Sequence, residues 1–398
     1  MNDLERARRS SIRGSLFGMA ICNALVPRDT TGFRSGMFRT ETSLAICVAR
    51  AIIEDGGYRY DKFTYIKRLL EWLKGNDLCE RGGYVRRSVA LALNAWDRQL
   101  AVASAMGNGG KDNEDWEMRK DRFDEMQKLI DKEFVVDCQR DGANLTCATP
   151  ISLYYILEDC YSESQMRIWA QQLSSLTHPH PMNRVLCSLC CELVHFAVAA
   201  GSRTTSTSSF VSKKLDKKWM AKVFAEQVHH VWIPSDDQRE YIVEVVNRLQ
   251  PYKDIEAWVA KAATDLKTTS SALDVFEAAL WCFFARGTFR EGAIEAVRLG
   301  GDSAAIGATY GALAGAYYGY EMIPSEWISA IQTPKVLEDV VDGLEKLREK
   351  QHNEIWDRGL ADIMEFEEDE SQSEEYSTQV SMSPSQRGLL PHESKRDS

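Results

Sequence analysis

Two short segments that lie far apart in the chain carry oxygen-bearing side chains directly before a helix-forming stretch. The first contains Arg39, Thr40 and Glu41, and the second contains Asp302 and Ser303. Hard cations such as Mg²⁺ take their ligands from carboxylate and hydroxyl oxygens, so the two segments could face each other across a metal site. The simpler alternative is a pair of ordinary helices whose first turns are capped by these side chains.

The helices that must position these residues are rich in small side chains. Two glycines permit a turn before Asp302, and an Ala-rich helix is predicted over 303–320. Glycine recurs there every four residues, from Gly307 to Gly319, so these positions share one face. Each glycine costs about 1 kcal/mol of helix propensity, which predicts a buried helix whose close packing offsets that cost. A second face of this kind is predicted over 12–26.

The chain is predicted to form one all-α domain over 1–362, because no alternating strand pattern bounded by hairpin turns is found. Surface insertions are expected near 103–140, with an exposed helix over 116–132, and near the Ser/Thr-rich stretch 201–218. Residues 363–398 form an acidic, Ser-rich tail whose composition cannot bury a core, so it is predicted to be disordered. Further helices are predicted over 42–53, 63–73, 84–100, 150–157, 164–176, 185–200, 217–230, 239–248, 254–262, 272–284, 289–299 and 327–351.

The composition excludes several classes of partner. A net charge of -11 argues against nucleic acid, because phosphate binding needs clustered Lys and Arg. We find no long apolar run and no signal peptide, so no membrane partner and a cytoplasmic location are expected. A CxxC spacing occurs at Cys187 and Cys190, with Cys191 next to it, but these residues lie in a helical pattern and no second pair of cysteines is nearby. We interpret them as buried free thiols rather than as a metal or redox site.

Several longer motifs place the chain close to a known family. They are SALDVFEAALWCF at 271–283, FREGAIEAVRLGGD at 289–302, GALAGAYYG at 311–319, IPSEW at 323–327 and LTHPHP at 176–181. On these motifs the sequence resembles the ADP-ribosylglycohydrolases, which include dinitrogenase reductase activating glycohydrolase and crystallin J1. The resemblance implies a compact orthogonal multi-helix bundle. It also implies hydrolysis of an N- or O-glycosidic bond to ADP-ribose, with two Mg²⁺ ions.

The sequence departs from this family at the metal ligands. The family's Thr-Asp-Asp-Thr is replaced by RTET at 39–42, and its Gly-Gly-Asp-Thr-Asp-Thr by GGDSAA at 300–305. Asn23 stands where the family has Asp, and the family's Gly-Asn-Gly-x-x-Met-Arg is reduced to DGANLTCATP at 141–150. These losses remove carboxylates that two Mg²⁺ ions and two helix N-termini require, so we expect at most one weakly held Mg²⁺, or none.

The resemblance also assigns roles to individual residues. The metal ligands that it leaves are Thr40, Glu41 and Asp302, and Glu41 is the candidate catalytic residue for activating water. The two histidines of the LTHPHP motif are expected to be structural, in a segment that joins helices. The candidate substrate-binding residues are Asn23, Arg39 and Ser303.

Three functions remain open at this stage, and whether the protein is an enzyme is open with them. The first is an ADP-ribosylglycohydrolase-like hydrolase with weakened or lost two-metal catalysis. The second is a non-catalytic pseudoenzyme that binds ADP-ribose or a related nucleotide. The third is a scaffold recruited to a small-molecule biosynthetic step. The expected partner is an ADP-ribose-like small molecule or an ADP-ribosylated substrate.

Overall fold

The computed structural model describes residues 3–25, 36–57, 60–75, 78, 85–105, 116–135, 140–154, 163–203, 216–229, 239–351 and 353. The chain divides into a first unit, Met1–Leu347, which holds every labelled helix, and a second unit that begins at Arg348. The predicted tail at 363–398 and the domain boundary at 362 lie outside the described residues. So do 106–115, 136–139 and 204–215 of the two predicted insertions.

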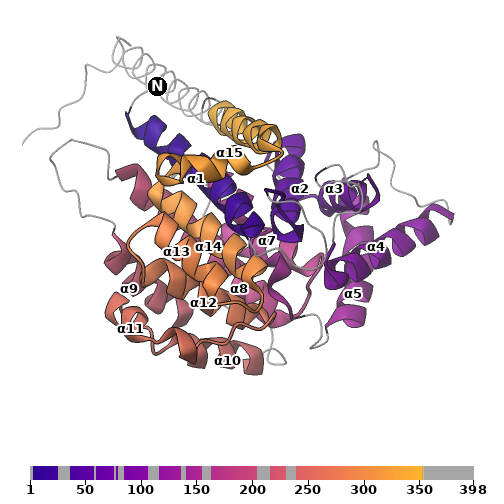
Figure 1. The fold of residues 1–398 in the computed structure, drawn as a ribbon. Coiled ribbons are helices and arrows are strands. Elements are labelled where there is room, and N and C mark those ends of the chain that lie inside the picture. The colour runs from indigo at the N-terminus through magenta and orange to yellow at the C-terminus, as the bar shows by residue number, and fades with distance from the viewer. Residues whose placement is uncertain are drawn as a thin grey trace, which may run out of the picture. The chain divides into compact units, whose positions relative to one another are not determined.

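Helices account for the regular structure of the described residues, in which no strand occurs (Figure 1). A lone antiparallel bridge joins Asp141 to Ser271. The predicted all-α multi-helix bundle is therefore confirmed. A helix is present in the first predicted insertion, but it is not the exposed helix that was predicted, because its side chains Phe123, Ile130 and Phe134 are buried. The α-helices are α1 (Asp3–Ala24), α2 (Thr40–Asp55), α3 (Lys62–Gly75), α4 (Arg87–Ala105), α5 (Trp116–Phe134), α6 (Thr149–Tyr154), α7 (Glu163–Ser175), α8 (Pro181–Arg203), α9 (Lys217–His229), α10 (Arg239–Leu249), α11 (Ile255–Ala260), α12 (Ala272–Phe284), α13 (Phe289–Arg298), α14 (Ser303–Tyr318) and α15 (Ser325–Ala330). Short 3-10 helices are η2 (Gly142–Asn144), η4 (Ala263–Asp265) and η5 (Tyr320–Met322).

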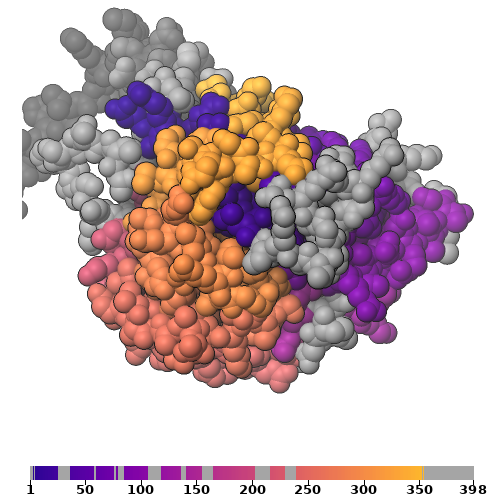
Figure 2. Space-filling view, in the orientation of Figure 1, coloured from indigo at the N-terminus to yellow at the C-terminus, as the bar shows by residue number. Residues whose placement is uncertain are grey.

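Helices α1 and α14 pack backbone against backbone in the core. A Cβ atom built on Gly311 would lie 2.1 Å from the carbonyl oxygen of Gly18, and one built on Gly315 would lie 1.9 Å from that of Gly14. The two small-residue faces predicted from the sequence therefore contact each other. In the space-filling view the indigo N-terminal residues show only small areas beside the orange and yellow C-terminal segments (Figure 2). This close contact fixes the end of α1 beside the start of α14.

Several predicted helix ends are wrong. Helix α1 starts at Asp3 and not at residue 12, and α4 ends at Ala105 and not at residue 100. Helix α14 ends at Tyr318, and Gly319, with a φ of 84°, ends the helix instead of continuing its small-residue face. The closing helix predicted over 327–351 is two helices, α15 and a second that starts at Pro334. Proline suits the first turn of a helix and disfavours helical backbone in the residue before it, so one helix cannot run through Thr333.

Helix α8 corrects the prediction that the chain has no long apolar run. Among the described residues, the stretch Pro181–Gly201 is long and apolar enough to cross a membrane by length and composition. In this structure 78% of the most apolar 18-residue window of that stretch is buried. A core helix of a helical bundle, which is mostly buried, has the same length and composition.

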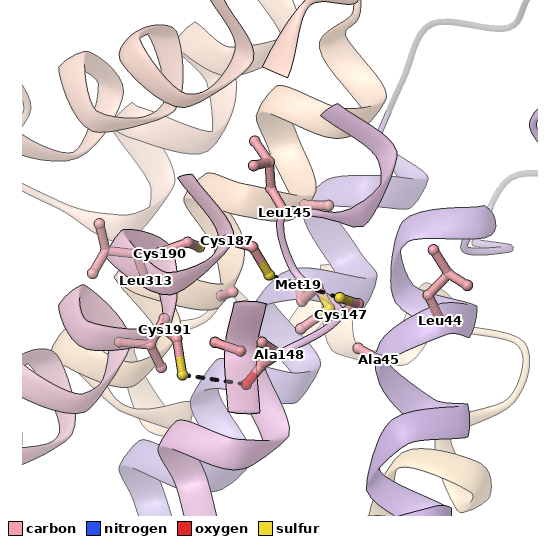
Figure 3. Close-up of a cluster of buried hydrophobic side chains, with 14 of the residues drawn as sticks. Met19, Leu44, Ala45, Leu145, Cys147, Ala148, Cys187, Cys190, Cys191 and Leu313 are labelled. Carbon is pink, nitrogen blue, oxygen red and sulfur yellow. Dashed lines mark hydrogen bonds between the residues drawn. The ribbon is translucent and has the colours of Figure 1, made fainter. Parts of the chain in front are cut away.

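The cysteines of α8 lie in a buried cluster with Cys147 (Figure 3). The sulfur atoms of Cys147 and Cys187 are 3.8 Å apart, and the Cys191 thiol donates a hydrogen bond to the carbonyl oxygen of Ala148 at 3.5 Å. Burial raises the pKa of the Cys190 and Cys191 thiols well above the usual range, so both stay neutral. Within the described part of the chain these are buried free thiols, as predicted.

Candidate functional site

Three helix ends bring the predicted site residues together. Asn23 is near the C-terminus of α1, Arg39 directly precedes α2, Glu41 lies in the first turn of α2, and Asp302 is the N-cap of α14. The two segments that were predicted to face each other do so. Asn23 joins them, because its Nδ2 donates to Oε2 of Glu41 at 3.0 Å and to the carbonyl oxygen of Ala304 at 3.1 Å.

The Asn23 amide is fully used in this network. Its Oδ1 accepts hydrogen bonds from the backbone N–H of Arg39 at 2.6 Å and from the hydroxyl of Thr42 at 3.1 Å. The residue is completely buried. Asn23 therefore fixes the start of α2 and one oxygen of Glu41, and its four hydrogen bonds leave little capacity for a ligand.

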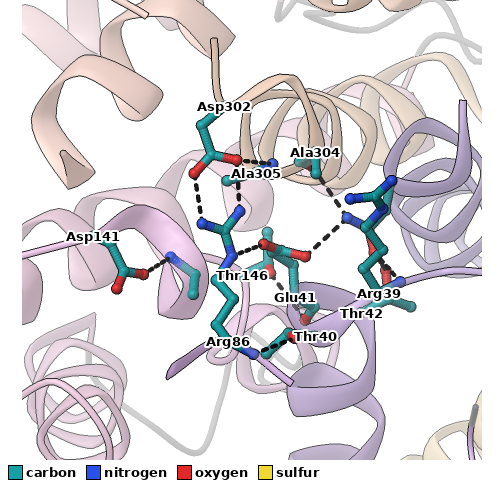
Figure 4. Close-up of polar contacts among 12 residues, drawn as sticks. Arg39, Thr40, Glu41, Thr42, Arg86, Asp141, Thr146, Asp302, Ala304 and Ala305 are labelled. Carbon is teal, nitrogen blue, oxygen red and sulfur yellow. Dashed lines mark hydrogen bonds and ion pairs between the residues drawn. The ribbon is translucent and has the colours of Figure 1, made fainter. Parts of the chain in front are cut away.

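The guanidinium of Arg86 lies between the two carboxylates (Figure 4). Its Nε donates to Oε1 of Glu41 at 2.6 Å, and its two terminal nitrogens donate to both oxygens of Asp302 at 2.7 and 2.5 Å. The side chain of Arg86 is 17% exposed, that of Glu41 is 1% exposed and that of Asp302 is 9% exposed, so these contacts are largely shielded from water. The backbone N–H of Arg86 also donates to the hydroxyl of Thr40 at 3.1 Å. Fork-shaped pairs of this kind are the strong class of charge-assisted hydrogen bonds.

A third carboxylate, Asp141, lies on the side of Arg86 that faces away from Glu41 in Figure 4. Nε2 of the buried His178 is 3.3 Å from its Oδ1, and a backbone N–H of η2 donates to the same oxygen at 2.9 Å. Burial alone would raise the pKa of Asp141, but His178 and this hydrogen bond hold it well below its usual range. Burial likewise opposes the charge on Arg86, yet Glu41, Asp302 and Asp141 together hold its pKa above the usual range. Arg86 is thus a permanent cation whose charge three carboxylates favour.

These residues do not fit the pair of Mg²⁺ ions that the sequence resemblance implies. Arg86 engages both oxygens of Asp302 and one of Glu41, Asn23 engages the other oxygen of Glu41, and the Thr40 hydroxyl accepts from the Arg86 backbone. A divalent cation about 4 Å from the guanidinium would be repelled by roughly 8 kcal/mol at an effective dielectric constant of 20. No group of three or more His, Cys, Asp and Glu side chains suited to a metal ion occurs among the described residues.

Sequence reasoning brought Glu41 and Asp302 to one site but missed Arg86. It lies in the segment before α4, in no motif that marks it. The available signal was electrostatic: two carboxylates buried at helix N-termini without metal need a cation, and an Arg-Arg pair stands at 86–87. The structure places Arg39 and Ser303 at the same helix ends as Glu41 and Asp302. Their role toward a substrate stays a prediction.

Comparisons with known proteins agree with this fold. A family model described as ADP-ribosylglycohydrolase matches residues 4–354. An ADP-ribosylarginine hydrolase Tri1 of Pseudomonas putida (strain GB-1) is 23% identical over 342 residues, which cover 80% of this chain and 73% of the relative. An ADP-ribosyl-dinitrogen reductase glycohydrolase of Rhodospirillum rubrum is 25% identical over 163 residues, or 41% of this chain and 42% of the relative. A solved structure described as an ADP-ribosylglycohydrolase-related protein complex has a TM-score of 0.57 and 19% identity, and it covers 86% of this chain and 99% of the other, which shows a shared fold.

Proposed function

The chain belongs to the ADP-ribosylglycohydrolase family, and from this premise we propose that it binds an ADP-ribosyl group without a metal ion and does not cleave it by the two-metal route. The observation that carries the proposal is the Arg86 bridge between Glu41 and Asp302. Arg86 supplies, from within the chain, a positive charge where the family is expected to use divalent cations. The site is therefore preorganised without an added ion.

The helix ends support an anionic ligand at this site. Helices α2 and α14 are each 16 residues long, and both begin here. A helix N-terminus carries about half a positive charge and free N–H groups, which favour phosphate. Asp302 accepts a hydrogen bond from the backbone of Ala305 at 3.3 Å, which uses one of these donors. We propose that the diphosphate of the ligand lies at the remaining N–H groups, with Arg39 as a second cation.

The contacts of Glu41 favour a binding function over hydrolysis. A general base must be able to reach a water molecule and take its proton. The Glu41 side chain is 1% exposed, and each of its oxygens already accepts a hydrogen bond. Residual hydrolysis is the second candidate function, because relatives are named as hydrolases of ADP-ribosylated arginine and ADP-ribosylated dinitrogen reductase. It would require Arg86 to leave both carboxylates.

Calorimetry with ADP-ribose tests the proposal. We expect the full-length protein to bind ADP-ribose in EDTA with the same affinity as in millimolar Mg²⁺. Arg39→Met should weaken binding, because it removes the proposed diphosphate contact. Arg290→Met is the matched control, since Arg290 pairs with Glu326 on the surface, and both side chains are more than half exposed.

An activity assay separates the two candidate functions. Peptides ADP-ribosylated on arginine and on serine are incubated with the protein in Mg²⁺ and in EDTA. Binding that needs Mg²⁺, together with Mg²⁺-dependent release of ADP-ribose, would refute the proposed binder and establish the hydrolase. Binding in EDTA without release supports the proposal.

A further inference from the structure

A cavity of about 280 Å³ lies between the segment that leads into α3 and the helices α5 and α7. It is distinct from the Arg86 site, because Glu41 is at the start of α2 whereas the lining residues all follow the end of α2 at Asp55. Fourteen residues of helix separate these two positions by about 21 Å. No residue of the Arg86 site lines the cavity, so whatever it binds is independent of the function proposed above.

Three aromatic rings form rigid walls of this cavity. Tyr60 stacks on Tyr65 with ring centroids 5.0 Å apart, and its centroid is 6.4 Å from that of Trp169. Phe123 is held between Phe63, which meets it edge-on at 5.7 Å, and Trp96, which stacks on it. Because the surrounding core fixes these rings, a flat ligand would meet a surface that does not have to be ordered on binding.

The charged groups of the cavity balance each other. Lys62 forms an ion pair with Asp124, and Asp61 forms one with Arg119 at 2.7 Å. Lys120 also lines the wall, so the lining residues carry two negative and two positive charges. An anion would meet two carboxylates and a cation would meet two lysines. The lining therefore favours a neutral ligand.

The hydroxyl of Tyr60 lacks a hydrogen-bond partner among the described residues although the oxygen is buried. Leaving such a group unpaired costs about 1–3 kcal/mol. Burial raises the pKa of Tyr60 well above its usual value, so the hydroxyl remains able to donate and to accept. The amide side chain of Gln172, which can do both as well, lines the same cavity.

We propose that this cavity is a second ligand site, and that it takes a neutral planar heteroaromatic ring with hydrogen-bonding groups, of the size of nicotinamide or a nucleobase. The ring packs on the wall made by Tyr60, Phe123 and Trp169, as flat rings do on aromatic side chains. A ring nitrogen or carbonyl oxygen of the ligand pairs with the Tyr60 hydroxyl. The ligand thus satisfies a group that the fold leaves unpaired.

Titration of the full-length protein with nicotinamide, followed by calorimetry and saturation-transfer NMR, tests the site. Cyclohexanecarboxamide is the matched probe, because it keeps the amide and the size but loses the flat ring. We expect Tyr60→Phe to weaken nicotinamide binding by about five- to tenfold, the value of one hydrogen bond. This variant should fold as wild type does, because the hydroxyl that it removes has no partner.

Two further variants locate the binding. Tyr318→Phe makes the same change at the end of α14, where the hydroxyl donates to Gly287 at 2.8 Å, and Arg39→Met alters the Arg86 site. Both should bind nicotinamide as wild type does. Absence of nicotinamide binding to wild type, equal binding by Tyr60→Phe, or equal binding of cyclohexanecarboxamide would each overturn the proposal.

Discussion

Replacing Arg86 by methionine tests the guanidinium bridge through stability. The change keeps an unbranched side chain but leaves Glu41 and Asp302, which are 1% and 9% exposed, without their shared counter-ion. Removing one partner of a buried ion pair costs about 3–5 kcal/mol. At about 2 °C per kcal/mol, the lower end for domains of 150–250 residues, the melting temperature should fall by roughly 6–10 °C. The melting temperature of Arg86→Lys, which keeps the positive charge but not the forked guanidinium, should fall less.

The stability of Arg86→Met should also depend on pH, in a direction that the two unpaired carboxylates determine. Two carboxylates that face each other without a counter-ion bind protons more readily in the folded than in the unfolded state. Stability of Arg86→Met should therefore rise as the pH falls from 7 toward about 5. Thermal denaturation at several pH values, followed by circular dichroism, measures this. A melting temperature within one degree of wild type at neutral pH would refute the buried bridge.

Magnesium provides the second half of this test. Once Arg86 is gone, the oxygens of Glu41 and Asp302 are available to a hard cation. A ligand at 100 times its Kd stabilises the folded state by about 2.7 kcal/mol, so Arg86→Met should regain several degrees in millimolar Mg²⁺ while wild type gains none. If wild type gains as much as the variant, Arg86 does not occupy the metal position.

Three other substitutions probe the surrounding structure. Asn23→Asp places a second carboxylate against Glu41, so it should lower the free energy of unfolding by about 3 kcal/mol or more, with the loss shrinking at low pH; a loss that is independent of pH would contradict the contact. Gly315→Ala should destabilise by about 1–3 kcal/mol or more, because its Cβ would lie 1.9 Å from a backbone oxygen. The control Gly75→Ala, with open space around it, should be neutral or gain up to about 1 kcal/mol. Asp141 has a lowered pKa, so its contribution is present above about pH 4 and lost below it; in urea titrations the difference between wild type and Asp141→Asn should shrink as the pH falls.

Much of the fold follows from local patterns in the sequence. The glycines that share one face of α14 predicted a close helix contact, and the structure supplies its partner in Gly14 and Gly18 of α1. The turn at Gly300 and Gly301 and the helix cap at Asp302 were also predicted from residue type. In the structure both glycines have positive φ, and the Asp302 side chain accepts a hydrogen bond from the backbone of Ala305. The closing helix was misjudged because the prediction over 327–351 did not use Pro334, which suits the first turn of a new helix.

The site was only half predictable, for a physical reason. Glu41 and Asp302 lie beside recognisable helix starts, so their types and neighbours identify them. Arg86 is identified only by what it meets across the bundle, 45 residues from Glu41 and 216 from Asp302. Asp141 likewise acts on the site only in the assembled fold, where its charge helps to raise the pKa of Arg86. Charge balance among buried groups is a property of the assembled fold, and a single sequence carries no local mark of it.

The central claim is that an arginine of the chain stands where the family is expected to hold metal ions. The most direct measurement is a crystal structure of the wild-type protein grown with Mn²⁺ and ADP-ribose, with anomalous scattering recorded at the manganese edge. We predict that no anomalous peak lies between Glu41 and Asp302, and that the Arg86 guanidinium remains on both carboxylates with ADP-ribose bound. A manganese peak between these carboxylates, with Arg86 turned away, would contradict the claim.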